Sequence, residues 1–143
     1  MIYKTRNTER IAKLHPKVKA MAEQWLGKLE TAKREVLITS GYRSKADQDL
    51  LYAQGRTKPG KVVTNARGGQ SLHNYGVAFD FCPCDDKGNC LWADPKKFKE
   101  YAAVGKMVGF EWGGEWASFP DPPHLQFLGG LTLSDFQKGK TFA

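Results

Sequence analysis

The sequence has no apolar run of about 18 residues, the length of a candidate transmembrane helix, and its N-terminal stretch lacks the apolar core of a secretory signal peptide. Internal repeats and low-complexity segments are also absent. We therefore expect no stable membrane association and no signal peptide. The length of 143 residues predicts one domain, 1–143, and leaves little room for a second.

Cysteine is scarce, with only Cys82, Cys84 and Cys90 in the whole sequence. An odd number of cysteines so closely spaced is a poor disulfide framework. Their spacing is also not one of the common zinc-binding patterns, and no histidine lies among them. We expect free thiols in a reducing compartment.

Acidic residues are outnumbered, since 22 Lys and Arg face 15 Asp and Glu and the net charge is +7. Such a surface is attracted to polyanions, which include nucleic acid, anionic lipid and the anionic polymers of a bacterial envelope. The densest basic cluster, residues 56–67, is interrupted by Gly and Pro. There is no basic helix with interleaved aromatic residues, so we expect no nucleic-acid partner.

Apolar spacing and capping residues predict an α+β protein in which helices cover a small antiparallel sheet. Helices are expected over 16–32, 45–54 and 95–108, and strands over 35–40, 77–81, 91–92, 110–112 and 124–128. The 91–92 strand is expected to close a hairpin with 77–81. Only a short turn is expected near Thr8, and a polar tail after residue 128.

Within the 95–108 helix, a stripe of apolar residues is expected to face the core. Its members are Phe98, Tyr101, Ala102 and Met107.

Histidine is as rare as cysteine, and the sequence around two of the three histidines is that expected of metal ligands. His15 precedes a proline at a helix start and is expected to be exposed. His73 lies seven positions before Asp80, a carboxylate in an otherwise apolar strand, and His124 opens the last strand. A buried carboxylate needs a cation or hydrogen-bond donors, and two histidines with one aspartate and an open fourth position make a catalytic zinc site.

One further carboxylate strengthens this interpretation. A single histidine is more often an ordinary core or surface residue than a metal ligand. However, Asp121 lies three residues before His124 and is separated from it by two prolines. A general base for a zinc-activated water is needed at such a position, so the combination favours a catalytic site with one Zn²⁺ per chain.

These residues also form motifs. The sequences SLHNYGVAFD at 71–80 and DPPH at 121–124 resemble the zinc signature of the lysostaphin/D-Ala-D-Ala peptidase/hedgehog superfamily. They are most similar to the branch that holds VanY-type D,D-carboxypeptidases and phage L-alanyl-D-glutamate endopeptidases. SGYRS at 40–44 with Gln48 resembles the upstream motif of that branch, and FEWGGEW at 110–116 resembles the stretch before its second histidine ligand.

The resemblance, which spans roughly residues 35–128, implies a role for each matching position. It implies that His73, Asp80 and His124 bind zinc, that Asp121 is the general base, and that Arg43 polarises the scissile carbonyl. A weaker set is expected to contact the substrate or to support the ligands from behind: Ser71, Gln48, Tyr75, Trp116 and Gln126. Glu115 is expected to be structural or to face the substrate.

The implied function is a zinc-dependent peptidoglycan peptidase, in first place a phage endolysin that cleaves the L-Ala-D-Glu bond of the stem peptide. The alternatives are a D,D- or L,D-carboxypeptidase and a non-catalytic zinc-binding module, although Asp121 argues against the last. The expected partner is bacterial peptidoglycan, bound by a monomer without a separate cell-wall-binding domain. We expect the protein to stay in the host cytoplasm until it reaches the wall, through a holin.

The net charge of +7 leads to a prediction about salt. Exposed charges are screened beyond a Debye length of about 8 Å at physiological ionic strength, so electrostatic attraction to the wall weakens as salt is added. Lysis of outer-membrane-permeabilised cells is expected to fall steeply as NaCl rises, while cleavage of a small soluble muropeptide changes little. Turbidity and chromatographic assays measure the two rates, and an equal response to salt would contradict an electrostatic wall anchor.

Overall fold

A four-stranded antiparallel sheet organises residues 1–142, the part of the chain that the computed structural model describes. Its strands lie in the order β1-β2-β4-β3 and comprise β1 (Glu35–Ser40), β2 (Ala78–Cys84), β3 (Glu111–Trp112) and β4 (His124–Gln126). Five α-helices accompany it: α1 (Lys4–Ile11), α2 (Pro16–Thr31), α3 (Lys45–Ala53), α4 (Pro95–Val108) and α5 (Leu133–Gln137). Two 3₁₀-helices, η1 (Leu72–Tyr75) and η2 (Gly113–Glu115), complete these elements and confirm the expected α+β class.

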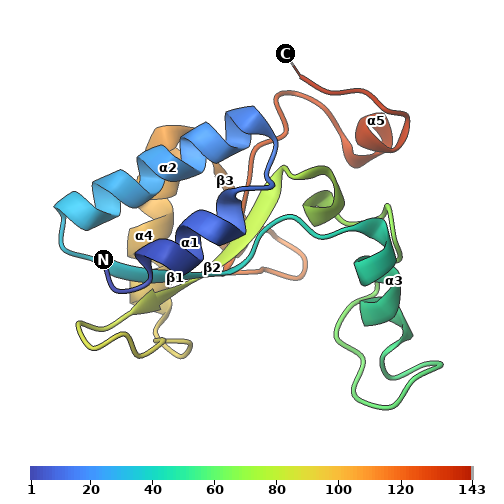
Figure 1. Cartoon of the computed structure of the whole chain (residues 1–143), viewed down its shortest axis with the longest axis horizontal. Helices are drawn as coiled ribbons and strands as arrows, with labels where there is room; N and C mark the ends of the chain where they lie inside the picture. Colours follow the sequence, from blue (N-terminus) through green and yellow to red (C-terminus); the bar gives the residue numbers. More distant parts are fainter. Residues whose placement is uncertain (143) are drawn as a thin grey trace.

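The helices are distributed unevenly around the sheet. α1 and α2 contact β1, whereas α4 contacts β2, β3 and α2. Figure 1 shows these three helices gathered around the sheet, while α3 and the loop over 54–70 stand out to one side. Among the helices formed by residues 1–142, none combines the length and apolar character that crossing a membrane requires.

The core is centred on Trp25 of α2 and two phenylalanines of β2. The Trp25 ring centroid lies 5.5 Å from that of Phe79 and 5.2 Å from that of Phe81, and its indole N–H donates to the Tyr101 carbonyl over 3.0 Å. Because side chains alternate along a strand, burying Phe79 and Phe81 turns Asp80 to the opposite face of the sheet. The hydrophobic core therefore sets which face of β2 carries polar chemistry.

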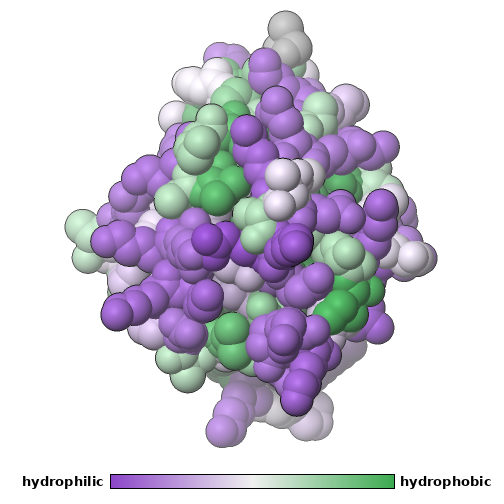
Figure 2. Space-filling view, turned by 90° about the vertical axis from the view of Figure 1, so that its left-hand side faces the viewer, coloured by the Kyte–Doolittle hydropathy of each residue, from purple (hydrophilic) through white to green (hydrophobic). Residues whose placement is uncertain are grey.

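The surface is largely polar. Figure 2 looks onto the side of the molecule that lies at the left in Figure 1. Hydrophilic side chains predominate there, and hydrophobic groups form small separate patches among them.

Two expectations about local structure were wrong. The 91–92 segment is not a strand, because only an isolated bridge between Cys84 and Cys90 forms before the chain turns away. Met107 is 76% exposed. The inward stripe of α4 instead continues to Gly105, which follows Phe98 and Tyr101 at helical spacing and lies so close to Leu125 that a Cβ would be 3.1 Å from it.

The two terminal helices were not predicted. α1 replaces the short turn expected near Thr8, and α5 lies in the segment expected to be a polar tail. The start of α5 had a readable signal, since Thr132 and Asp135 form a capping box, and Phe136 is buried against the core. α1 had no such signal because it buries only Asn7 and Ile11.

Asn7 explains why the polar helix α1 packs where it does. Its side chain donates to the Val36 carbonyl over 3.0 Å and accepts from the Ile38 N–H over 2.8 Å. β1 is an edge strand, and these two bonds satisfy backbone groups that would otherwise be unpaired. Arg10 adds bonds from its guanidinium to the carbonyls of Ile38 and Thr39. α1 therefore covers the free edge of the sheet.

This contact predicts the effect of a substitution. Asn7→Ala leaves a buried N–H and a buried C=O of β1 without partners and is expected to lower the free energy of unfolding by about 2 to 4 kcal/mol. Urea denaturation measures the change. The neighbouring Thr8→Ala, on the exposed side of α1, serves as control and is expected to change stability by less than about 0.5 kcal/mol. Equal unfolding midpoints for the two variants would contradict this role of Asn7.

Candidate metal centre

Three potential ligands from three elements converge on one point: His73 from η1, Asp80 from β2 and His124 from β4. The Asp80 carboxylate lies 3.5 Å from His73 Nε2 through one oxygen and 3.5 Å from His124 Nδ1 through the other. The ligand atoms all lie within 4.8 Å of one another, and no other such group exists among residues 1–142.

The backbone explains this convergence. Asp80 and His124 are directly paired residues of β2 and β4, so their side chains project side by side from one face of the sheet. His73 reaches the same point because η1 ends at Gly76 with φ +70°, a left-handed conformation that favours glycine. A Cβ on Gly76 would also lie only 2.7 Å from the backbone N of His15.

Hydrogen bonds fix which nitrogen of each imidazole faces the centre. His73 Nδ1 lies 2.9 Å from the Gly41 carbonyl, which can only accept, so Nδ1 carries the proton and Nε2 presents its lone pair. His124 Nε2 lies 2.7 Å from Gln126 Oε1. The Gln126 amide nitrogen donates to Glu111 over 3.3 Å, which identifies its oxygen as the atom facing His124. In their neutral forms, both histidines therefore direct the lone pair of the other ring nitrogen toward Asp80.

The Asp80 carboxylate is suited to hold a cation. Its Oδ1 atom is buried, and among residues 1–142 it is the one buried side-chain oxygen or nitrogen without a hydrogen-bond partner. Burial alone would raise the pKa of Asp80, but hydrogen bonds and charge attraction from the facing His124 and His73 rings, when these are protonated, outweigh burial and hold the pKa below its ordinary value. An ionised carboxylate and two imidazole lone pairs match the donor set of a three-ligand zinc site with an open fourth position.

Asp121 stands beside this centre, half-exposed, with its carboxylate 3.9 Å from His124 Nδ1. Its backbone N–H donates to the Gly113 carbonyl over 2.9 Å, and its carbonyl accepts from the His124 N–H. A Cβ on Gly113 would lie 2.5 Å from the Asp121 carbonyl oxygen, so only glycine allows this close approach. Burial, followed by repulsion from Asp80, raises the pKa of Asp121 above its ordinary value.

Arg43 also lines the space in front of the potential ligands, and hydrogen bonds fix the position of its side chain. Its guanidinium donates to Gln48 Oε1 over 3.0 Å and to Ser40 Oγ over 2.8 Å. Gln48 is buried, and its amide in turn donates to the Ala66 carbonyl. The backbone of Arg43 is tied to η1, because its N–H donates to the carbonyl of His73.

These groups line one cleft of about 410 Å³. It contains the three potential ligands together with both predicted catalytic residues; its walls are formed by Arg43, Leu51, Val63, Thr64, Ser71, His73, Asp80, Asp121 and His124. The cleft therefore lies between the sheet and α3.

The remaining predicted site residues lie at varying distances from the centre. Ser71 caps η1 by accepting from the His73 N–H, and Gln126 contacts His124 as described. The Trp116 ring centroid lies 5.0 Å from that of His124. Tyr75 points elsewhere, since its hydroxyl donates to the Gly69 carbonyl and its ring stacks on Phe136. Glu115 forms an exposed ion pair with Lys106 over 2.8 Å.

Glu111 is a participant that the sequence did not reveal. It follows no recognisable spacing relative to the histidines, and it reaches the site only because β3 pairs with β4 so that Glu111 lies opposite Gln126. The position of Glu111 depends on the pairing of two very short strands, and sequence patterns do not predict such a pairing.

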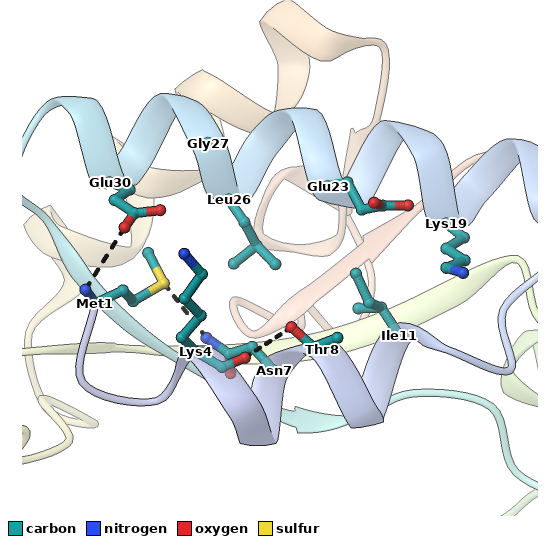
Figure 3. Close-up of a pocket in the computed structure, with 10 residues that line it drawn as sticks. All are labelled: Met1, Lys4, Asn7, Thr8, Ile11, Lys19, Glu23, Leu26, Gly27 and Glu30. Carbon is teal, nitrogen blue, oxygen red and sulfur yellow. Dashed lines mark hydrogen bonds and ion pairs between the residues drawn. The ribbon is translucent and has the colours of Figure 1, made fainter.

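A second cavity, of about 280 Å³, lies between α1 and α2. Figure 3 shows Met1, Lys4 and Glu30 at one end and Lys19 and Glu23 near the other. The lining residues carry charges of both signs but include no histidine or cysteine. This cavity therefore lacks the set of potential metal ligands that the cleft contains.

Comparison with known proteins places the chain in a family. A family model described as D-alanyl-D-alanine carboxypeptidase matches residues 64–127. The peptidoglycan L-alanyl-D-glutamate endopeptidase CwlK of Bacillus subtilis (strain 168) is 42% identical over 123 residues, covering 80% of this chain and 74% of that protein. The L-alanyl-D-glutamate peptidase of Listeria phage A118 is 34% identical over 141 residues, covering 96% of this chain but only 46% of the phage protein.

Solved structures share the fold. The Serratia marcescens L-Ala D-Glu endopeptidase ChiX superposes with a TM-score of 0.65 at 22% identity, covering 92% of this chain and 90% of that one. A VanY D,D-pentapeptidase in complex with Zn(II) gives a TM-score of 0.58 at 12% identity, with 87% and 78% covered. The fold is that of the D-Ala-D-Ala peptidase/hedgehog superfamily. The chain belongs to the branch of this metallopeptidase superfamily that includes VanY-type carboxypeptidases and L-alanyl-D-glutamate endopeptidases.

Proposed function

We propose that this protein is a zinc-dependent peptidoglycan peptidase that cleaves the L-Ala-D-Glu bond of the stem peptide, as a phage endolysin. One observation carries the proposal above all: two imidazole nitrogens and a buried, unpartnered carboxylate oxygen meet beside Asp121 in an open cleft. The names of the Bacillus and Listeria phage relatives support the choice of bond.

In this proposal His73, Asp80 and His124 hold one zinc ion per chain. Zinc, when bound, supplies a Lewis acid that makes a water molecule easier to deprotonate and polarises a carbonyl group. The hydrogen bonds from His73 to Gly41 and from His124 to Gln126 would keep the ligand rings in the required tautomers.

Asp121 is proposed as the general base that accepts a proton from the attacking water and passes it to the leaving amine. Its raised pKa suits both halves of this task, because a base works best when its pKa approaches the working pH. Gly113 and the two prolines restrain its backbone, which keeps the carboxylate beside the metal centre.

Arg43 is proposed to stabilise the negative charge that develops on the scissile carbonyl oxygen. Gln48 and Ser40 each accept from one end of the guanidinium, which fixes its orientation and leaves other N–H groups for the substrate. Donors that are fixed before the reaction stabilise a developing oxyanion most effectively.

The alternative within the same chemistry is a D,D- or L,D-carboxypeptidase, which the description of the matching family model favours. Mass spectrometry of digested muropeptides separates the two. An L-Ala-D-Glu endopeptidase releases a peptide that begins with D-Glu, whereas a carboxypeptidase removes only the terminal residue of the stem. The monomeric state and release from the host cytoplasm through a holin are further parts of the proposal.

Removal of ligands gives the first test of this proposal. The His73→Ala/His124→Ala double variant is expected to lose stoichiometric zinc, because a single carboxylate cannot retain the ion. Metal analysis of the purified proteins measures zinc per chain. His15→Ala, at the start of α2 and outside the cleft, is the control and is expected to keep one zinc. Retention of one zinc in the double variant would refute the ligand assignment.

Removal of the base gives the second test. Asp121→Ala is expected to keep the fold and the metal but to lose at least about a hundredfold in the rate of muropeptide cleavage, the lower scale for a general base. Glu115→Ala is the matched control, because this nearby carboxylate is exposed and paired with Lys106. Near-normal turnover of the Asp121 variant, or an equal loss in both variants, would remove Asp121 from this role.

A further inference from the structure

The three cysteines lie together at the end of β2 that is far from the metal centre. Cys82 and Cys84 belong to the strand, and Cys90 follows the turn over 85–89. In Figure 1 this turn projects on the side of the molecule opposite α3. All three thiols are free, but the sulfur atoms of Cys84 and Cys90 are only 3.9 Å apart.

Backbone geometry favours a covalent link between these two residues. Cys84 and Cys90 form an antiparallel bridge. It is flanked by the bond from the Asp85 N–H to the Asn89 carbonyl (2.9 Å) and the bond from the Leu91 N–H to the Pro83 carbonyl (2.8 Å). The flanking bonds define a non-hydrogen-bonded pair, in which Cα atoms lie about 4.5 Å apart and side chains approach most closely. That separation falls within the range of roughly 4.4 to 6.8 Å that disulfides require.

The turn that joins the two cysteines is already ordered. Asp85 Oδ1 accepts from the N–H groups of Lys87 and Asn89 over 3.0 and 2.8 Å, and its other oxygen accepts from the Asn89 side-chain amide. The backbone therefore already holds the two cysteines as directly paired residues.

The two thiols differ in access. Cys90 is partly exposed, whereas Cys84 is buried with 5% of its surface accessible. Burial, followed by the proximity of Cys90, raises the pKa of Cys84 to about 12. An external reagent therefore meets Cys90 first, since Cys84 is less accessible.

We propose that Cys84 and Cys90 form an oxidation site that closes to an intramolecular disulfide by exchange with a low-molecular-weight disulfide. The Cys90 thiolate attacks the external S–S bond, which forms a mixed disulfide and expels one small thiolate. The Cys84 sulfur, as it loses its proton, attacks the Cys90 sulfur and expels the second. Two protein thiols are oxidised by two electrons, the small disulfide is reduced to two thiols, and the two protons go to these products.

This site does not depend on the proposed peptidase function. The link would tie the last residue of β2 to the segment after the turn, and so restrict the unfolded chain. A protein that moves from a reducing to an oxidising environment would gain stability there without any change at the metal centre.

Cys82 is the competing partner. Cys82 lies two residues before Cys84 on the same face of β2. It is also close to Cys90, because burial and, after it, the proximity of Cys90 raise the pKa of Cys82 to about 12. Direct pairing favours Cys84, because the isolated bridge joins Cys90 to Cys84 and not to Cys82.

The experiment treats the full chain with excess oxidised glutathione under native conditions and compares it with protein kept in dithiothreitol. Thiol titration after denaturation is expected to fall from three thiols per chain to one, and non-reducing peptide mapping is expected to find Cys84 joined to Cys90. The thermal unfolding midpoint is expected to rise on oxidation and to return on reduction.

Variants sharpen the test. Cys90→Ser and Cys84→Ser are expected to abolish the link, while Cys82→Ser, the matched buried control, is expected to retain it. Peptide mapping of the unaltered protein decides the question even if a buried variant fails to fold. Three persistent thiols, a stable glutathione adduct on Cys90, or a link between Cys82 and Cys90 would each overturn the proposal.

Discussion

The pairing of β2 with β4 is the constraint on which the site depends. It sets Asp80 directly opposite His124, and this register is locked because Phe79 and Phe81 must stay in the core around Trp25. A slip of one residue would turn Asp80 into the core and a phenylalanine into the cleft. The hydrophobic core therefore does more than stabilise the chain, since it excludes the one-residue slips that would turn the carboxylate away from the two imidazoles.

Support for the two histidines is divided between backbone and side chain. His73 is oriented by the Gly41 carbonyl, whose position follows from the path of the chain after β1. His124 is oriented by the Gln126 amide, which relies on Glu111 to keep its oxygen in place. In the neutral rings both arrangements leave a lone pair directed at Asp80, so the polar groups behind the centre select the tautomer that a cation needs.

The sequence could predict elements whose signal is local. β1, α2 and the capped helix α3 appear close to where Ser44 and the apolar spacing indicate, and the potential ligands were found because their motifs are contiguous. It could not predict Asn7, which acts on a strand some thirty residues away, or Glu111, which acts through a pairing of two short strands. The cysteine count pointed away from a disulfide, whereas the proximity of Cys84 to Cys90 depends on a turn whose geometry composition does not fix.

The cleft has two walls of different character, and this difference bears on substrate choice. The sheet side carries Asp80 and His124 on strands anchored in the core, and His73 on η1 beside them. The opposite side is the loop over 54–70, which is held mainly by polar contacts such as Gln48 to Ala66 and Asp49 to Gly68, while Val63 on its cleft-facing stretch remains largely exposed. Side chains of the loop side can change without disturbing the core, whereas those of the sheet side cannot. In the proposed peptidase, the loop side is therefore the wall better suited to select among the bonds of a stem peptide.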